Sequence, residues 1–261
     1  LNIFFAPYLE GMSDEELYQI AQTLVYEFNQ LAGGRGGQVA FTDINLYYEV
    51  PAHFRHVPAI GPGGMETGRT YGEYASSAKR FLRALFRVYL AGDRRGQPFF
   101  FPKPLLHITE GFFREEGWEE TLALACELAA EKGNTYFVFD RGDVVKVSEC
   151  CRLSFELDDR DLLDAATPWK LRFCALQNVT LNLPRFAYRS GKDRDALFDL
   201  VDHYMDLAAM AHVQKRDFIR GLLARGKEGP LAALCVEHDG EPYLRFSRAK
   251  YLVGILGVNE M

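Results

Sequence analysis

Apolar residues recur at helical spacing in four stretches of the chain, and each stretch predicts an amphipathic helix. The first helix begins at Ser13, and Glu16 three residues later completes a capping box, the signature of a helix N-terminus. Leu17 and Leu24 share one face of this helix, and the glycines that begin at Gly33 end it. The four predicted helices span residues 13–31, 71–91, 119–132 and 195–225.

Shorter apolar runs between these helices predict strands. They span residues 38–48, 99–108, 136–139, 178–183, 231–236 and 251–257. Pro102 and Pro104 predict that the second strand is irregular or lies at a sheet edge. Residues 51–68, with the run Gly61-Pro-Gly-Gly64, predict a loop. Strands alternating with long helices favour an α/β fold with parallel strands in one domain, and the pattern does not decide between an open sheet and a closed barrel.

Composition places the chain among ordinary soluble globular proteins. It has 261 residues, of which 48% are hydrophobic and 25% charged, with a formal net charge of −6. No basic stripe indicates nucleic-acid binding, and no apolar run is long enough to span a membrane. Five cysteines without a framework pattern, and no secretory signal, predict a reducing cytoplasm. Because the chain opens on Leu1 and stops just after a predicted strand, we expect it to be a segment of a longer polypeptide.

Two adjacent cysteines, in the run Cys150-Cys151-Arg152-Leu153, are the most unusual chemical feature. Consecutive Cα atoms lie about 3.8 Å apart, whereas an ordinary disulfide needs roughly 4.4–6.8 Å. Structural zinc sites need two cysteine pairs with wider spacing, and the remaining cysteines are single. The pair therefore suggests a thiol that is used for its reactivity.

Three interpretations of the cysteine pair remain open at this point. The thiols are half-buried loop residues, or one is a nucleophilic or redox cysteine whose thiolate Arg152 favours, or one performs hydrogen-atom chemistry as a thiyl radical. The last needs a sulfur at a loop tip inside a closed cavity and no base. Sequence spacing does not separate the second interpretation from the third.

Other candidate motifs have simpler explanations. Ala32-Gly-Gly-Arg-Gly-Gly-Gln38 follows a helix and precedes a strand, the reverse of a phosphate-binding glycine loop, and is typical of a helix end. His107 lies on an apolar run and is expected to be a hydrogen-bonded core histidine rather than a ligand. His203 and His212 are nine residues apart on a predicted helix, which is not metal-binding spacing.

Six motifs in the chain, taken together and in order, resemble the catalytic core of the class III anaerobic ribonucleoside-triphosphate reductases, which are glycyl radical enzymes. The resemblance covers essentially the whole chain and is strongest to the archaeal and Thermotoga-like branch. The motifs are Ala32-Gly-Gly-Arg-Gly-Gly-Gln-Val-Ala-Phe-Thr-Asp-Ile-Asn-Leu46, Ala59-Ile-Gly-Pro-Gly-Gly64, Phe101-Pro-Lys-Pro-Leu-Leu-His-Ile108, Cys150-Cys-Arg-Leu153, Asn178-Val-Thr-Leu-Asn-Leu-Pro-Arg185 and Leu256-Gly-Val-Asn-Glu260.

This resemblance implies part of a ten-stranded α/β barrel, with a finger loop that carries the radical cysteine at its tip. In the family that cysteine immediately precedes the arginine, so the role falls to Cys151, with Cys150 as the alternative. The resulting thiyl takes the 3′ hydrogen of the ribose, the 2′ hydroxyl leaves as water, and a reductant completes the deoxynucleotide. A barrel interior that excludes solvent suits this chemistry, and desolvation favours the neutral thiol.

Several parts of the family pattern are missing from the sequence. It has no glycyl radical motif, because neither Gly254 nor Gly257 has that context, and the C-terminal zinc cysteines, the N-terminal ATP cone and the upstream second active-site cysteine are absent. The segment is therefore expected to be inactive alone. Ala175 and Leu176 stand where formate-using members carry an asparagine, which argues against formate as the reductant and leaves a thioredoxin- or glutaredoxin-like protein as the other candidate.

The resemblance also implies partners and weaker site predictions. The partners are a ribonucleoside triphosphate substrate, dNTP and ATP effectors, a radical S-adenosylmethionine activase and a second copy in a homodimer. Strand ends within the motifs are where α/β folds gather ligands. The substrate-binding residues predicted on this ground are Gly36, Gly37, Gln38, Asn182 and Asn259.

Two other functions stay open from the sequence. One is another glycyl radical enzyme, of the formate-lyase-like type, although the Asn-Leu-Pro-Arg run favours the reductase. The other is a non-catalytic nucleotide-binding module descended from the barrel. The reading frame downstream discriminates among them, since a glycyl radical motif there would support an enzyme.

Overall fold

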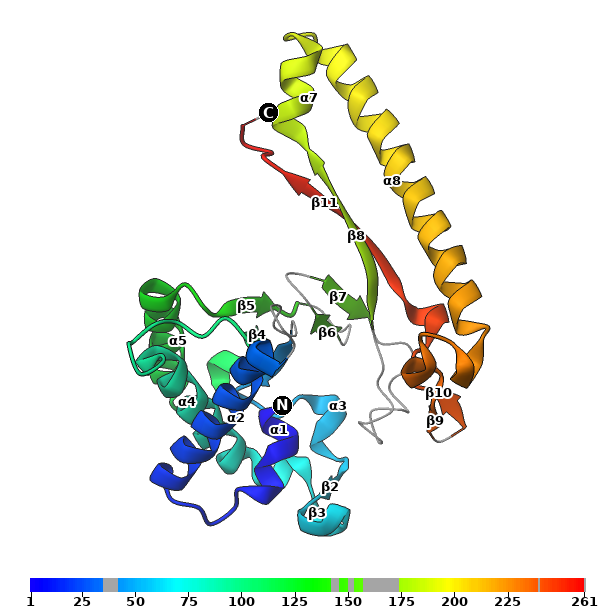
Figure 1. The fold of residues 1–261 in the computed structure, drawn as a ribbon. Helices are drawn as coiled ribbons and strands as arrows, with labels where there is room; N and C mark the ends of the chain where they lie inside the picture. Colours follow the sequence, from blue (N-terminus) through cyan, green and yellow to red (C-terminus); the bar gives the residue numbers. More distant parts are fainter. Residues whose placement is uncertain (35–41, 142–145, 150–152, 157–173, 239, 261) are drawn as a thin grey trace. The chain divides into compact units, whose positions relative to one another are not determined.

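The computed structural model describes residues 1–34, 42–141, 146–149, 153–156, 174–238 and 240–260 (Figure 1). The chain divides into two compact units, Leu1–Leu171 and Arg172–Met261, and each is described by itself. Both units combine helices with parallel strand pairs, so the predicted α/β class with parallel strands is confirmed. The prediction of a single barrel domain stays a prediction.

A three-stranded parallel sheet forms the centre of the first unit. Its strands are β1 (Asp43–Tyr47), β4 (Lys103–Ile108) and β5 (Tyr136–Phe139), in the order β1-β4-β5. Of the two expectations for residues 99–108, the edge position is wrong, because β4 is central and buried along its whole length, whereas residues 99–102 are irregular and lie outside the strand. The N–H of Lys103 donates to Thr42 on the β1 side. Pro104 therefore faces the β5 side, where pairing begins only at Leu105, and its missing N–H removes no ladder bond.

Three helices pack against this sheet. They are α2 (Asp14–Gly34), α4 (Ala75–Ala91) and α5 (Trp118–Lys132), and they confirm three of the predicted helices. The capping box at the start of α2 is present: the N–H of Ser13 donates to Glu16 (2.8 Å), and Ser13 Oγ accepts from the Glu16 N–H (3.3 Å). The 71–91 helix begins instead with a 3₁₀ turn, Tyr71–Tyr74. Gly133, with φ of +63°, ends α5 in the left-handed conformation that glycine favours.

Residues 51–68 are more ordered than the predicted loop. They form α3 (Ala52–Arg55) and an antiparallel hairpin of β2 (Pro58–Ile60) and β3 (Glu66–Thr70). Gly63 and Gly64 turn the chain between these strands, with φ of +80° and +73°. The glycines that predicted a loop are thus the turn of a hairpin whose strands are too short to show a period.

A second antiparallel hairpin follows β5 in the chain. It pairs β6 (Lys146–Glu149) with β7 (Leu153–Glu156), and its last register pair joins Glu149 to Leu153.

The second unit is built on the parallel pair β8 (Ala175–Asn182) and β11 (Lys250–Leu256). α7 (Leu183–Ser190) follows β8, and the 30-residue helix α8 (Arg194–Leu223) runs back along the strands, as Figure 1 shows. A small apolar cluster joins these elements through Leu181, Leu183 and Phe186. Two short strands, β9 (Glu237–His238) and β10 (Glu241–Pro242), complete the described part of the unit.

The prediction of a strand at residues 231–236 is wrong. Ala232–Cys235 form a 3₁₀ helix, in which the Leu234 N–H donates to the Leu231 carbonyl (2.9 Å). Gly229 and Pro230 start a turn just before this run. A short apolar run has no period that separates a strand from a helical turn.

Candidate functional site

The two faces of the β1-β4-β5 sheet have opposite character. Side chains alternate between faces along a strand, and register partners in a parallel sheet share a face. One face carries Ile44, Leu46, Leu106 and Ile108, and it packs with α2, α4 and α5 into the main apolar cluster. This face is an ordinary core and positions the strands.

The opposite face is polar, although much of it is buried. It consists of alternate residues of each strand: Asp43, Asn45 and Tyr47 of β1, Lys103, Leu105 and His107 of β4, and Tyr136 and Val138 of β5, with Asp140 one residue beyond β5. Buried polar groups must be paired, so a polar sheet face has a role other than packing alone. We take this polar face as the candidate functional site.

An ion pair lies at the N-terminal end of the polar face. Lys103 Nζ lies 3.1 Å from Asp43 Oδ1, and the two side chains are only 10% and 12% exposed. Lys103 Nζ also lies 5.5 Å from the centroid of the Tyr136 ring. These contacts connect all three strands, and the carboxylate of Asp43 compensates the buried positive charge of Lys103.

A histidine network lies at the C-terminal end of the same face. Nδ1 of His107 lies 2.6 Å from Oδ2 of Asp140, and its Nε2 lies 2.6 Å from Oδ1 of Asn45. The Tyr47 ring stacks on the imidazole, with centroids 4.2 Å apart. Burial first, and then the charge of Asp140, raises the pKa of the Tyr47 hydroxyl, so the phenol stays protonated.

Both ring nitrogens of His107 therefore contact protein groups, and the ring is 1% exposed. The prediction of a hydrogen-bonded core histidine is confirmed. His212 is also buried and bonds the Leu252 carbonyl through Nε2 (2.9 Å), whereas its Nδ1 has no partner among the described residues. Within the described residues, no group of three or more His, Cys, Asp or Glu side chains could hold a metal ion.

His53, on α3, is the other histidine near this network. Burial lowers its pKa to about 4, with smaller effects from Asp140, which raises the pKa, and His107, which lowers it. The imidazole is therefore neutral near pH 7.

Most of the predicted site residues fall outside the part of the chain that the structure describes. Cys150, Cys151, Gly36, Gly37 and Gln38 all lie outside the described residues. Their predicted roles stay predictions.

The other two predicted residues, Asn182 and Asn259, follow neighbouring strands of the second unit. Asn182 ends β8, is paired in register with Leu256, and caps α7 by accepting the Arg185 N–H (3.1 Å). Asn259 lies three residues beyond Leu256 and is exposed. The sheet thus brings both segments to one edge, as the α/β argument expects, while the Asn182 side chain already serves as a helix cap.

Sequence reasoning missed most of the polar face. The available signal was the alternation of polar residues at positions 43, 45 and 47 and at 103 and 107 within apolar strands. Asp140 carries no such signal, because it stands at the start of a polar stretch. Its partnership with His107 depends on the neighbouring strands β4 and β5, which bring the two side chains together.

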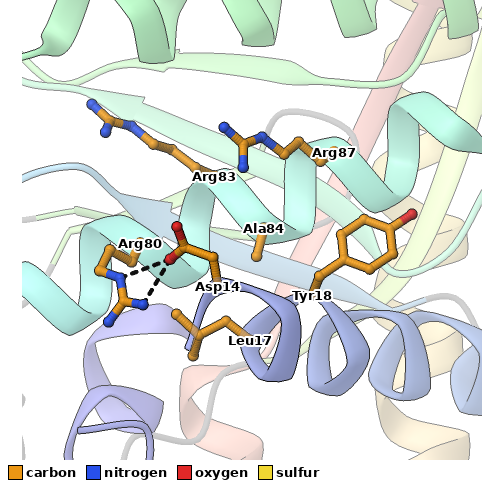
Figure 2. Close-up of a pocket in the computed structure, with 7 residues that line it drawn as sticks. All are labelled: Asp14, Leu17, Tyr18, Arg80, Arg83, Ala84 and Arg87. Atoms are coloured by element: carbon orange, nitrogen blue, oxygen red, sulfur yellow. Dashed lines mark hydrogen bonds and ion pairs between the residues drawn. The ribbon is translucent and has the colours of Figure 1, made fainter. Parts of the chain in front are cut away.

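A separate cleft of about 220 Å³ lies between α2 and α4, on the helical side of the first unit (Figure 2). Three arginines of α4 line it, and Arg80 is held by Asp14 through Nε (2.9 Å) and Nη2 (2.7 Å). Arg83 Nη2 donates to the Tyr48 hydroxyl (2.9 Å) and the Gly117 carbonyl (3.0 Å). Two of the three charges are thus engaged in bonds that join elements of the fold.

None of the helices in the described part of the chain combines the length and apolar character that a membrane span requires.

Comparisons with known proteins agree with the resemblance drawn from the motifs. The family model for anaerobic ribonucleoside-triphosphate reductase matches residues 1–261. A search of curated proteins finds no match.

Solved structures also match the fold. A Thermotoga maritima anaerobic ribonucleotide reductase in complex with dATP and CTP aligns at a TM-score of 0.59 and 18% identity, over 95% of this chain and 38% of that one. Another structure titled anaerobic ribonucleotide reductase aligns at a TM-score of 0.60 and 18% identity, over 95% of this chain and 35% of the other. The chain therefore spans little more than a third of the structures that it matches.

Proposed function

Because the chain belongs to the anaerobic ribonucleoside-triphosphate reductase family, we propose that it is a segment of the catalytic barrel of an enzyme that reduces ribonucleoside triphosphates to 2′-deoxyribonucleoside triphosphates. The polar face of β1-β4-β5 would then face the barrel interior, and the apolar face its outer helices. CTP is one candidate substrate, since a matched Thermotoga maritima reductase is described in complex with dATP and CTP.

The β6–β7 hairpin is the observation that carries the radical mechanism. Pairing of Glu149 with Leu153 leaves three residues to connect the strands, and these are Cys150, Cys151 and Arg152. The described strands of this hairpin agree with the finger loop that the family resemblance implies. We assign the hydrogen-atom transfer to Cys151, with Cys150 as the alternative.

The proposed reaction removes the 2′ hydroxyl of the ribose as water and puts a hydrogen in its place. The Cys151 thiyl takes the 3′ hydrogen, the 2′ hydroxyl takes a proton and leaves as water, and the reductant supplies two electrons and a proton. The hydrogen then returns from sulfur to C3′, which restores the thiyl. The reductant is formate, oxidised to carbon dioxide, or a thioredoxin- or glutaredoxin-like dithiol, oxidised to a disulfide.

The remaining partners belong to the complete polypeptide. A glycyl radical outside this sequence, generated by a radical S-adenosylmethionine activase, supplies the radical that oxidises the cysteine thiol. The structural zinc of the family and the ATP cone also lie outside it. We propose a cytoplasmic homodimer with dNTP and ATP effectors. The described residues of this chain would position the substrate and exclude water.

The decisive experiment uses the complete polypeptide and its activase under anaerobic conditions. Cys151→Ala should abolish deoxynucleotide formation, while the glycyl radical signal in electron paramagnetic resonance survives. Cys126→Ala, which changes an exposed cysteine of α5, is the matched control and should keep activity. Activity retained in Cys151→Ala but lost in Cys150→Ala would reverse the assignment, and activity retained in both would overturn the mechanism.

A further inference from the structure

Two polar atoms beside the His107 network are buried and have no partner in the described part of the chain. They are Oδ1 of Asp140 and Nε2 of His53. His53 stands beside the network, because its ring lies 4.1 Å from the ring of Phe54, and Phe54 packs in one apolar cluster with Tyr47, which stacks on His107. The charge of Asp140 also raises the pKa of His53. A buried polar atom without a partner is costly, so such a pair forms a place where a bound group would supply the missing hydrogen bonds.

The His107 network holds the Asp140 carboxylate in place. Oδ2 is bonded by His107 Nδ1 (2.6 Å), and His107 is in turn fixed by Asn45 and by the Tyr47 ring. Oδ2 of Asp140 is thus bonded within the protein, and Oδ1 remains able to accept a hydrogen bond from a ligand. A site whose geometry is fixed before binding loses little freedom when a ligand arrives.

The chemistry of the two atoms selects a hydroxyl group. A carboxylate oxygen accepts a hydrogen bond, and a neutral imidazole nitrogen either donates or accepts. A hydroxyl serves both, because it donates through its O–H and accepts through its lone pairs. A phosphate offers no proton to Asp140 and would be repelled by its charge.

We propose that Asp140 and His53 bind a ribose hydroxyl of the nucleotide, with His107 and Asn45 positioning the Asp140 carboxylate. This assignment rests on the proposed function and adds to it the group that distinguishes a ribonucleotide from analogues lacking a hydroxyl. Position agrees with it, since Asp140 and His107 lie at the carboxyl ends of parallel strands, where α/β folds bind ligands.

The test compares nucleotides that differ by one hydroxyl. CTP, 2′-deoxy-CTP and 3′-deoxy-CTP compete for the substrate site of the complete enzyme at a fixed, saturating effector concentration. Since a hydrogen bond to a charged group changes affinity by roughly 10- to 100-fold, the wild type should prefer CTP over one analogue by that factor. Asp140→Asn replaces the free acceptor by a donor of the same shape, and the preference should fall to within about 3-fold.

Controls separate this role from a structural one. His53→Gln should reduce the same preference, and it provides a second variant if Asp140→Asn does not fold. Asp14→Asn, at the cleft between α2 and α4, should leave the preference unchanged. A preference that stays intact in both Asp140→Asn and His53→Gln would overturn the inference and indicate a buried water only. A wild type that forms no deoxynucleotide would instead overturn the proposed function, so the two failures are distinguishable.

Discussion

At the scale of single residues, two arginines of α4 differ in what they contribute to the stability of the fold. Arg83 and Arg87 both line the cleft between α2 and α4 (Figure 2). Arg83 bonds Tyr48, Gly117 and Thr121, which joins α4 to the residue that follows β1 and to the start of α5. Arg87 is exposed, and the described residues offer it no hydrogen-bond or ion-pair partner.

Arg83→Met should therefore destabilise the fold while Arg87→Met should not. Truncating Arg83 removes the donor to the Tyr48 hydroxyl and one of two side-chain donors to the Gly117 carbonyl, which the Thr121 hydroxyl also bonds, and this costs about 2 kcal/mol. Arg87→Met should change the free energy of unfolding by less than about 0.5 kcal/mol, as surface changes usually do. Chemical denaturation measures both. Equal effects would mean that the Arg83 bonds are replaced by water.

His53 gives a pH prediction with a definite sign. Its pKa is lowered from the ordinary 6.5 to about 4. Between these values the unfolded chain binds a proton that the folded protein does not, so stability is full above about pH 6.5 and falls as the pH drops toward 4.

His53→Gln should flatten this part of the stability curve. Denaturation midpoints measured from pH 7 to pH 4 test it, and the matched control is His56→Gln, which changes an exposed histidine three residues on. His56→Gln should keep the wild-type dependence of stability on pH. If His53→Gln keeps it as well, the prediction is contradicted.

The sequence indicated the chemistry of the site better than its geometry. The cysteine pair and the family motifs were visible because they are contiguous. The Asp140–His107–Asn45 network was not, because its members are 62 and 33 residues apart and meet only through strand pairing. His107 was expected to be a hydrogen-bonded core residue, but its partners depend on the register of β1, β4 and β5.

At the scale of elements, helices were predicted well because their ends carry local signals. Ser13 and Glu16 form their capping box, and Gly133 ends α5. Strands were harder to predict. Pro104 was interpreted as a sign of an edge strand, because only the strand register shows which side its missing N–H faces. The 231–236 run was too short to show a period that separates a strand from a helical turn.

The capping box of α2 predicts opposite effects for two hydroxyl deletions in that helix. Ser13→Ala removes the acceptor for the Glu16 N–H and should destabilise by about 1 kcal/mol. Thr23→Ala removes a mid-helix hydroxyl bonded to the Gln19 carbonyl (2.9 Å) and should stabilise by about 0.5 kcal/mol, since alanine is the better helix former. Thermal melts of the two variants should shift in opposite directions. A Ser13→Ala variant that melts at or above the wild-type temperature would show that the cap adds nothing to the free energy of unfolding, and a lower melt of Thr23→Ala would show that its hydroxyl stabilises the helix.

At the scale of the whole molecule, the two units differ in how well their strands are covered. β4 is buried at every residue, whereas no residue of β11 is fully buried, and Ile255 and Leu256 are exposed by 60% and 56%. Parallel strands are normally covered on both faces, and a two-stranded sheet is marginal alone. α8 also exposes large apolar side chains, including Phe198, Met210 and Phe218. A helix that is apolar on several sides is usually buried by neighbours.

These exposures lead to a prediction about the 261-residue chain compared with the longer polypeptide proposed above. In the chain alone, backbone amides of β8 and β11 should exchange hydrogen at least about 100-fold faster than those of β1 and β4, because little apolar burial opposes their local opening. In the complete enzyme, where further barrel strands would cover them, the difference should largely disappear. Hydrogen exchange followed by mass spectrometry measures both. If β8 and β11 are as protected as β1 and β4 in the chain alone, the second unit is stable by itself, and its exposed apolar surface would no longer support a place in a larger barrel.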